Sequence, residues 1–250
     1  MTLVNIFTII NPALCSVYYK NVDLNVFVVV VGVRKKMKAK EDIRTILIDN
    51  AIHLIAMGGF EKATTKNLAH YSESMSNFKM NEVYIYRLFG SKEELYQSAF
   101  LTLDEELVQA FRNALMSNPS DFVLNTKKEF YQFFLKVWQF LLNNEERCRC
   151  YVRYYYSVYF KNKALENHQQ NFNFFVEKFS PLFIEEANVT AIMHSVFTTL
   201  LDFAVRVYNG ELINDEENRP HIFNVLYCML VTYLKHPDVS GIEKLQIRLL

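Results

Sequence analysis

Four neighbouring residues, Glu82, Val83, Tyr84 and Tyr86, place a carboxylate, a branched apolar group and two phenol rings close together. On a helix whose Ile85 faces inward, these four side chains are left to face outward. The carboxylate of Glu82 could accept a hydrogen bond from a cytosine amino group, and Val83 could touch a thymine methyl group. Two outward-facing tyrosines leave apolar surface in water, which favours a partner. Glu82 at the first turn also stabilises the helix dipole, so a purely local role is an equal alternative.

Two short helices joined by a turn would have to position these side chains. Thr64 or Thr65 can cap the first, because a hydroxyl there accepts an otherwise unpaired amide hydrogen, and Leu68 and Ala69 would then face inward. The second is predicted over residues 80–89.

The boundaries of this second helix are also readable in the sequence. Asn81 is its predicted cap, its predicted anchors are Ile85, Leu88 and Phe89, and Gly90 ends it. Ser91 and Glu94 then form a capping box at the start of a long third helix. This order of elements predicts a helix-turn-helix.

A supporting helix precedes this stretch. Apolar residues recur at helical spacing at Ile43, Leu47, Ala51, Leu54 and Ile55, and Gly58-Gly59 is predicted to end the helix in a left-handed cap.

The residues TT-x-x-L-A at 64–69, followed by N-E-V-Y-I-Y-R-L-F-G-S-K-E-E-L at 81–95, resemble the DNA-binding head of TetR/AcrR-type transcriptional regulators over roughly residues 41–96. One departure is plain, since the family's usual spacing between the two motifs is shorter and the excess lies in residues 70–79. The resemblance implies phosphate contacts by Thr65, Tyr86 and Lys92, and a base or backbone contact by Lys66. The full set of DNA-binding residues expected is Thr65, Lys66, Asn81, Glu82, Val83, Tyr84, Tyr86, Arg87 and Lys92.

What the resemblance implies for function is a DNA-binding transcriptional regulator, most simply a homodimeric repressor that a small-molecule effector releases from a palindromic operator in double-stranded DNA. Activation instead of repression stays open. Family members usually dimerise through a four-helix bundle made by the last two long helices of each subunit.

The rest of the chain predicts an all-α body. Helical apolar patterns span residues 91–116, 124–143, 145–160, 164–183, 189–208 and 219–235. The last two are apolar nearly all round, so a second surface must cover them. We expect that cover to be a second subunit, with a wholly internal core as the alternative.

Aromatic residues of the body could line a ligand pocket with a few polar tips. The candidates are Tyr131, Phe134, Trp138, Tyr151, Tyr155, Phe174, His194 and Phe197, and Arg153 and His194 are the polar groups best suited to orient a ligand. Simple core packing is the alternative for each of them. The effector itself is not readable from the sequence.

We expect three regions: an N-terminal extension over residues 1–36, a DNA-binding domain over 37–96 and an effector-binding and dimerisation domain over 97–250. The extension has three interpretations, namely a stretch upstream of a true start at Met37, a poorly packed tail, or a membrane anchor. The run Leu24–Val33 is about half the ~20 residues that a membrane span needs, although Arg34-Lys35-Lys36 follows it.

Charge and motif content exclude several function classes. The chain has zero net charge, with 27 basic and 27 acidic residues, so no global field indicates nucleic acid. Its four cysteines have no metal-ligand spacing, and its six histidines form no H-x-x-x-H pair. We therefore expect a cytoplasmic protein that is no enzyme, has no catalytic residue, metal or cofactor, and is free of the membrane. A ligand-binding or membrane-tethered helical sensor without DNA binding is the alternative.

Overall fold

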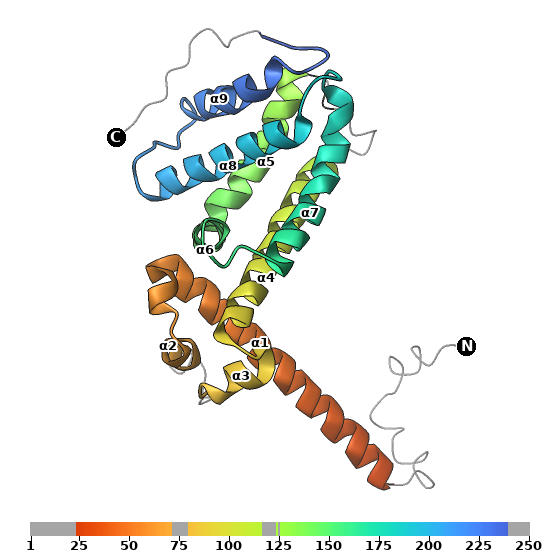
Figure 1. Cartoon of the computed structure of the whole chain (residues 1–250), viewed down its shortest axis with the longest axis vertical. Coiled ribbons are helices and arrows are strands. Elements are labelled where there is room, and N and C mark those ends of the chain that lie inside the picture. The colour runs from red at the N-terminus through yellow and green to blue at the C-terminus, as the bar shows by residue number, and fades with distance from the viewer. Residues whose placement is uncertain (1–23, 72–79, 117–123, 125, 240–250) are drawn as a thin grey trace, which may run out of the picture. The chain divides into compact units, whose positions relative to one another are not determined.

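The computed structural model describes residues 24–71, 80–116, 124 and 126–239, and side chains from Asp42 onward. Within that part of the chain the regular elements are helical, and the predicted all-α class is confirmed (Figure 1). The two compact units are Met1–Ile46 and Leu47–Leu250. The domain boundaries expected from the sequence stay a prediction.

The first helix, α1 (Leu24–Lys62), begins earlier than the sequence analysis expected. Residues 24–36, expected to belong to the N-terminal extension, are helical, and no proline lies between Leu24 and Gly58. The predicted stop is confirmed at Gly59, whose φ of 73° and ψ of −175° break the helical path inside α1. Residues 1–23 lie outside the described residues.

Two short helices and one long helix follow. These are α2 (Thr65–His70), α3 (Val83–Phe89) and α4 (Lys92–Met116), as the helix-turn-helix pattern predicted. Most of the unusually long stretch 70–79, namely residues 72–79, lies outside the described residues.

Five more α-helices build the body around α4. They are α5 (Lys127–Asn143), α6 (Glu145–Tyr155), α7 (Lys163–Phe179), α8 (Val189–Tyr208) and α9 (Arg219–Val231), with the short 3₁₀ helix η4 (Ser180–Leu182) after α7. Thr126 and Glu129 form a capping box that starts α5. The predicted helices 145–160 and 219–235 end earlier, at Tyr155 and Val231.

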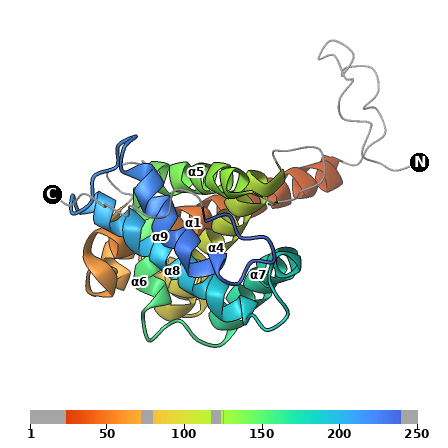
Figure 2. The same cartoon turned by 90° about the horizontal axis from the view of Figure 1, so that it is seen from above.

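Packing joins helices that lie far apart in the sequence. The helix α4 contacts α3 at its start and then α5, α6 and α7 along its length, so it runs from the helix-turn-helix into the body. The helices α8 and α9 lie side by side in both views (Figure 1 and Figure 2). A short antiparallel bridge between Phe183 and Leu234 ties the end of η4 to the chain after α9.

Candidate functional site

The first helix of the helix-turn-helix is fixed at both ends. Thr64 Oγ1 accepts a hydrogen bond from the Asn67 amide at 3.2 Å, which is the predicted cap of α2. Leu68 and Ala69 are fully buried, as predicted. At the other end, Asn50 of α1 donates its side-chain amide to the Leu68 carbonyl at 2.8 Å. The position of α2 is therefore set by α1.

The second helix presents its first turn to the outside. The N-cap position of α3 is Glu82, one residue after the predicted cap, and it makes no side-chain cap bond; Asn81 Oδ1 instead accepts from the Val83 amide at 3.2 Å, just before the helix. Ile85 is fully buried, whereas the other two expected anchors, Leu88 and Phe89, are half-buried. Gly90, at φ 88°, ends α3 in the left-handed region.

One half of the predicted capping box at the start of α4 is present. Ser91 Oγ accepts from the Glu94 amide at 3.1 Å.

Exposure divides the expected DNA-binding residues into two groups. Val83 and Tyr86 expose 65% and 55% of their surface, and Lys66, Asn81 and Arg87 are exposed too. Tyr84, expected to face outward, is only half-exposed, and so are Thr65, Glu82 and Lys92. Lys92 Nζ lies 5.6 Å from the centre of the Tyr96 ring and 3.9 Å from a Glu93 carboxylate oxygen.

Two of the expected DNA contacts bind each other. The Thr65 hydroxyl on α2 donates a hydrogen bond to the Glu82 carboxylate at the start of α3. The bond uses the only proton of the Thr65 hydroxyl, so this hydroxyl cannot also donate to a phosphate while the bond holds. It links the two helices of the motif directly, and this pairing was not foreseen from the sequence.

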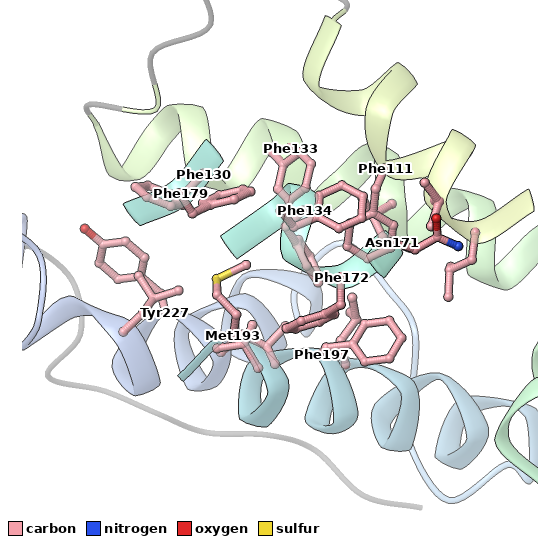
Figure 3. Close-up of a pocket in the computed structure, with 18 of the residues that line it drawn as sticks. Phe111, Phe130, Phe133, Phe134, Asn171, Phe172, Phe179, Met193, Phe197 and Tyr227 are labelled. Atoms are coloured by element: carbon pink, nitrogen blue, oxygen red, sulfur yellow. The ribbon is translucent and has the colours of Figure 1, made fainter. Parts of the chain in front are cut away.

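The body contains an apolar cavity. Its volume is about 100 Å³, taken as the space open to the centres of water-sized spheres, whereas about 10–15 Å³ would hold one water molecule. Among the described residues, nine phenylalanines line it, together with aliphatic side chains from α4, α5, α8 and α9 (Figure 3). The polar side chains of the lining are Asp104, Tyr151, His168, Asn171 and Tyr227.

Three of the eight expected pocket residues, Phe134, Tyr151 and Phe197, line this cavity. The other five do not. Trp138 donates its Nε1–H to Asn214 at 2.9 Å, and His194 stacks on Phe172 with ring centres 3.7 Å apart. The remaining three have aromatic or cationic neighbours instead: Tyr131 packs against Phe223, Tyr155 against Phe160, and Phe174 against Arg112. Arg153, the other polar candidate, does not line the cavity.

A buried carboxylate at the cavity wall was missed by the sequence analysis. Asp104 on α4 is 1% exposed and accepts hydrogen bonds on both oxygens. Oδ1 accepts from the Tyr151 hydroxyl at 3.2 Å and from His168 Nδ1 at 2.9 Å. Oδ2 accepts from the side-chain amides of Asn167 at 3.2 Å and Asn171 at 2.7 Å. We call these five residues the Asp104 cluster.

The Asp104 cluster has a sequence signal only in part. Asn167, His168 and Asn171 fall on one face of α7, because residues three and four apart are neighbours on a helix. Asp104 interrupts the apolar stripe of α4 between Leu103 and Leu107. What brings the groups together is tertiary packing of α4, α6 and α7.

Burial governs the protonation chemistry around the cluster. It raises the pKa of Tyr151 well above its ordinary value, and the negative charge of Asp104 raises it further, so the phenol stays protonated. Burial also lowers the pKa of His194, and the neighbouring His168 lowers it further.

The helix α6 connects this cavity to the helix-turn-helix. Tyr151 on α6 lines the cavity, and two positions later Arg153 Nη1 donates to the Ile55 carbonyl of α1 at 2.8 Å. Arg147, one turn before Tyr151, lies 3.7 Å from Asp49 of α1 and 3.1 Å from Glu106 of α4. A single helix therefore touches both the cavity and α1, the helix that supports the helix-turn-helix.

No group of three or more metal-ligating side chains occurs among the described residues. Two helical stretches, Asp42–Lys62 and Val189–Tyr208, are long and apolar enough to cross a bilayer by length and composition alone, a property that core helices share. The absence of a membrane association stays a prediction.

Comparison with solved structures identifies the fold. A TetR family transcription regulator from Marinobacter aquaeolei VT8 matches with a TM-score of 0.59 at 14% identity, over 78% of this chain and 97% of that one. The fatty acid degradation regulator FadR from Bacillus halodurans matches with a TM-score of 0.52 at 15% identity, over 73% of this chain and 93% of that one. A protein of unknown function from Rhodococcus sp. RHA1 scores 0.54 at 13% identity, over 77% and 95%. No protein-family model and no curated protein matches the sequence. The chain thus has the fold of TetR family transcription regulators.

Proposed function

We propose that this chain is a DNA-binding transcriptional regulator that acts as a homodimer and loses affinity for its operator when an effector enters the cavity of the body. One observation carries this proposal. In a helix-turn-helix whose Ile85, Leu68 and Ala69 are fully buried, Val83 and Tyr86 remain exposed on α3, the helix that would enter the major groove.

The exposed residues suit different parts of DNA. Val83 can contact a thymine methyl group, and Asn81 can bond an adenine edge. Lys66 and Arg87, both exposed, supply positive charge for the phosphate backbone, and the Tyr86 hydroxyl can donate to a phosphate. Glu82 would reach a cytosine amino group with the acceptor sites that Thr65 leaves unoccupied.

An uncovered apolar stripe supports the homodimer. Phe203 and Val207 on α8 and Val225 on α9 are half-exposed although they lie on the two most apolar helices of the body. A second copy of the same pair of helices would bury this stripe in a two-fold interface. The two helix-turn-helix motifs would then need to lie about 34–36 Å apart to reach successive major grooves.

The contacts of α6 suggest how an effector would act. Arg147 and Arg153 lie on the same helix as Tyr151, and both contact α1. A ligand that displaces Tyr151 would therefore also move these two contacts. If the effector binds better to the displaced arrangement, it weakens DNA binding by the same factor by which DNA weakens effector binding. Repression is the simplest outcome of such release.

The test is fluorescence-anisotropy binding of the full chain to DNA from its own promoter region at about 50 and 200 mM salt. We expect salt-sensitive, sequence-selective binding that Tyr86→Ala weakens strongly. Tyr156→Ala is the matched control, because Tyr156 is a similarly exposed tyrosine, at 68%, on the body. If native protein and Tyr86→Ala bind every sequence equally weakly, the proposal is wrong and a sensor without DNA binding is favoured.

A further inference from the structure

His168 lines the cavity and carries a buried, unsatisfied polar atom. The residue is 3% exposed and lines the cavity next to Tyr151 and Phe172. Its Nδ1 is bound to Asp104, but its Nε2 is buried and has no hydrogen-bond partner among the described residues. Leaving a buried polar atom unpaired costs about 1–3 kcal/mol, so a group that bonds Nε2 would bind favourably.

The Asp104 cluster determines which chemistry Nε2 offers. An ionised carboxylate has about four acceptor sites, and Asp104 receives a donor at each of them from Tyr151, His168, Asn167 and Asn171. A carboxylate oxygen only accepts, so the 2.9 Å contact between Asp104 Oδ1 and His168 Nδ1 is a hydrogen bond in the tautomer that has its proton on Nδ1; the Tyr151 hydroxyl lies 3.2 Å from the same Nδ1. In a neutral ring with Nδ1 protonated, Nε2 is an acceptor.

The charges around Nε2 select against ionised ligands. A carboxylate ligand would lie near the negative Asp104, and the described lining holds no lysine or arginine to offset the repulsion. An ammonium ligand has three donors to satisfy, whereas the oxygens of Asp104 are already occupied and Nε2 accepts one bond. A single hydroxyl fits, because it donates one hydrogen bond.

The rest of the lining sets the shape of the ligand. In Figure 3, Asn171 of the Asp104 cluster lies towards one end of the lining, and Tyr227, Phe130 and Phe179 lie towards the other. Phenylalanines fill the space between, among them Phe133, Phe134 and Phe172. An elongated apolar body therefore suits the cavity, with its polar group at the His168 end.

We propose that the cavity binds a neutral, elongated apolar molecule with a hydroxyl at one end, which donates to Nε2 of His168. This inference names the effector class of the proposed function and rests on it only for the consequence at DNA. Binding itself is a property of the cavity and is measured without DNA.

The experiment titrates the full chain with 1-decanol, decanoate and decylammonium by calorimetry. We expect 1-decanol to bind at least about tenfold more tightly than either ion. His168→Phe removes the acceptor and keeps a ring, and it should weaken 1-decanol binding roughly tenfold. His168→Gln restores an acceptor near the position of Nε2 and should recover most of the affinity.

Thermal unfolding of each variant separates lost binding from lost folding. Tyr227→Phe is the matched control, because it removes a hydroxyl from the cavity lining at the end away from His168. The inference is overturned if decanoate or decylammonium binds best, or if folded His168→Phe binds 1-decanol as the native chain does. If 1-decanol binds as expected but leaves DNA affinity unchanged, the ligand class stands and the effector mechanism of the proposed function fails.

Discussion

Replacing Asp104 by leucine should destabilise the protein because it removes the acceptor from four donors at once. Asn167 and Asn171 are only half-buried and can turn towards water, but Tyr151 and His168 are buried and would keep only one hydrogen bond between them, from the Tyr151 hydroxyl to His168 Nδ1 at 3.2 Å. One buried polar group is then left unpaired, and the expected loss in the free energy of unfolding is about 1–3 kcal/mol.

A triple variant tests whether unpaired donors are the cause. Replacing both partners of a buried hydrogen bond by apolar groups of similar shape is nearly neutral. Asp104→Leu combined with Tyr151→Phe and His168→Phe should therefore recover most of the lost stability.

Urea unfolding followed by far-ultraviolet circular dichroism measures both variants, with equal m-values as the check that the unfolded states are comparable. The reasoning is refuted if Asp104→Leu costs less than about 1 kcal/mol, or if the triple variant is as unstable as the single one.

Three other predictions concern a buried thiol, the proposed interface and a histidine. Because burial raises the pKa of Cys148 to about 11, its thiol should react with iodoacetamide at pH 8 far more slowly than the thiol of half-exposed Cys228. Peptide mass spectrometry measures both rates, and equal rates would contradict the burial of Cys148. Phe203→Lys should convert the proposed dimer to monomer in sedimentation velocity, while Glu185→Lys, an exposed site before α8, should not; a Phe203→Lys variant that sediments as the native chain does would exclude this interface. The pKa of His194 is lowered on folding, so near the ordinary histidine pKa the unfolded chain binds more protons, and the free energy of unfolding falls as the pH drops through that range. His194→Gln removes this loss, so the stability of the variant relative to the native chain should be greater at pH 5 than at pH 8. An equal difference at the two pH values would contradict this.

The sequence was sufficient where short-range chemistry decides the structure. Gly59 and Gly90 adopt positive φ where the pattern placed helix ends, and Thr64 and Ser91 each accept the amide hydrogen expected of a cap. These outcomes depend on a few consecutive residues and on backbone sterics.

The candidate sites were less predictable because they depend on partners distant in sequence. Asp104 meets Tyr151 and His168 from positions 47 and 64 residues away, and no local pattern encodes that meeting. Similarly, Thr65 and Glu82 looked like two free contacts until α2 and α3 brought them together. Aromatic spacing alone could not tell Phe134, which lines the cavity, from Trp138 one turn later, which turns away from it.

The position of Trp138 makes the protein its own optical reporter. It is the one tryptophan of the chain, 1% exposed, and its Nε1–H is bound to Asn214 in the connection between α8 and α9. Its ring stacks on Phe134, which lines the cavity, with ring centres 5.6 Å apart. Indole emission therefore originates from a single place that adjoins both the cavity wall and the connection joining the two helices of the proposed interface. A change in emission wavelength or intensity on adding a ligand, or on diluting the proposed dimer, can be assigned to that place without any introduced label.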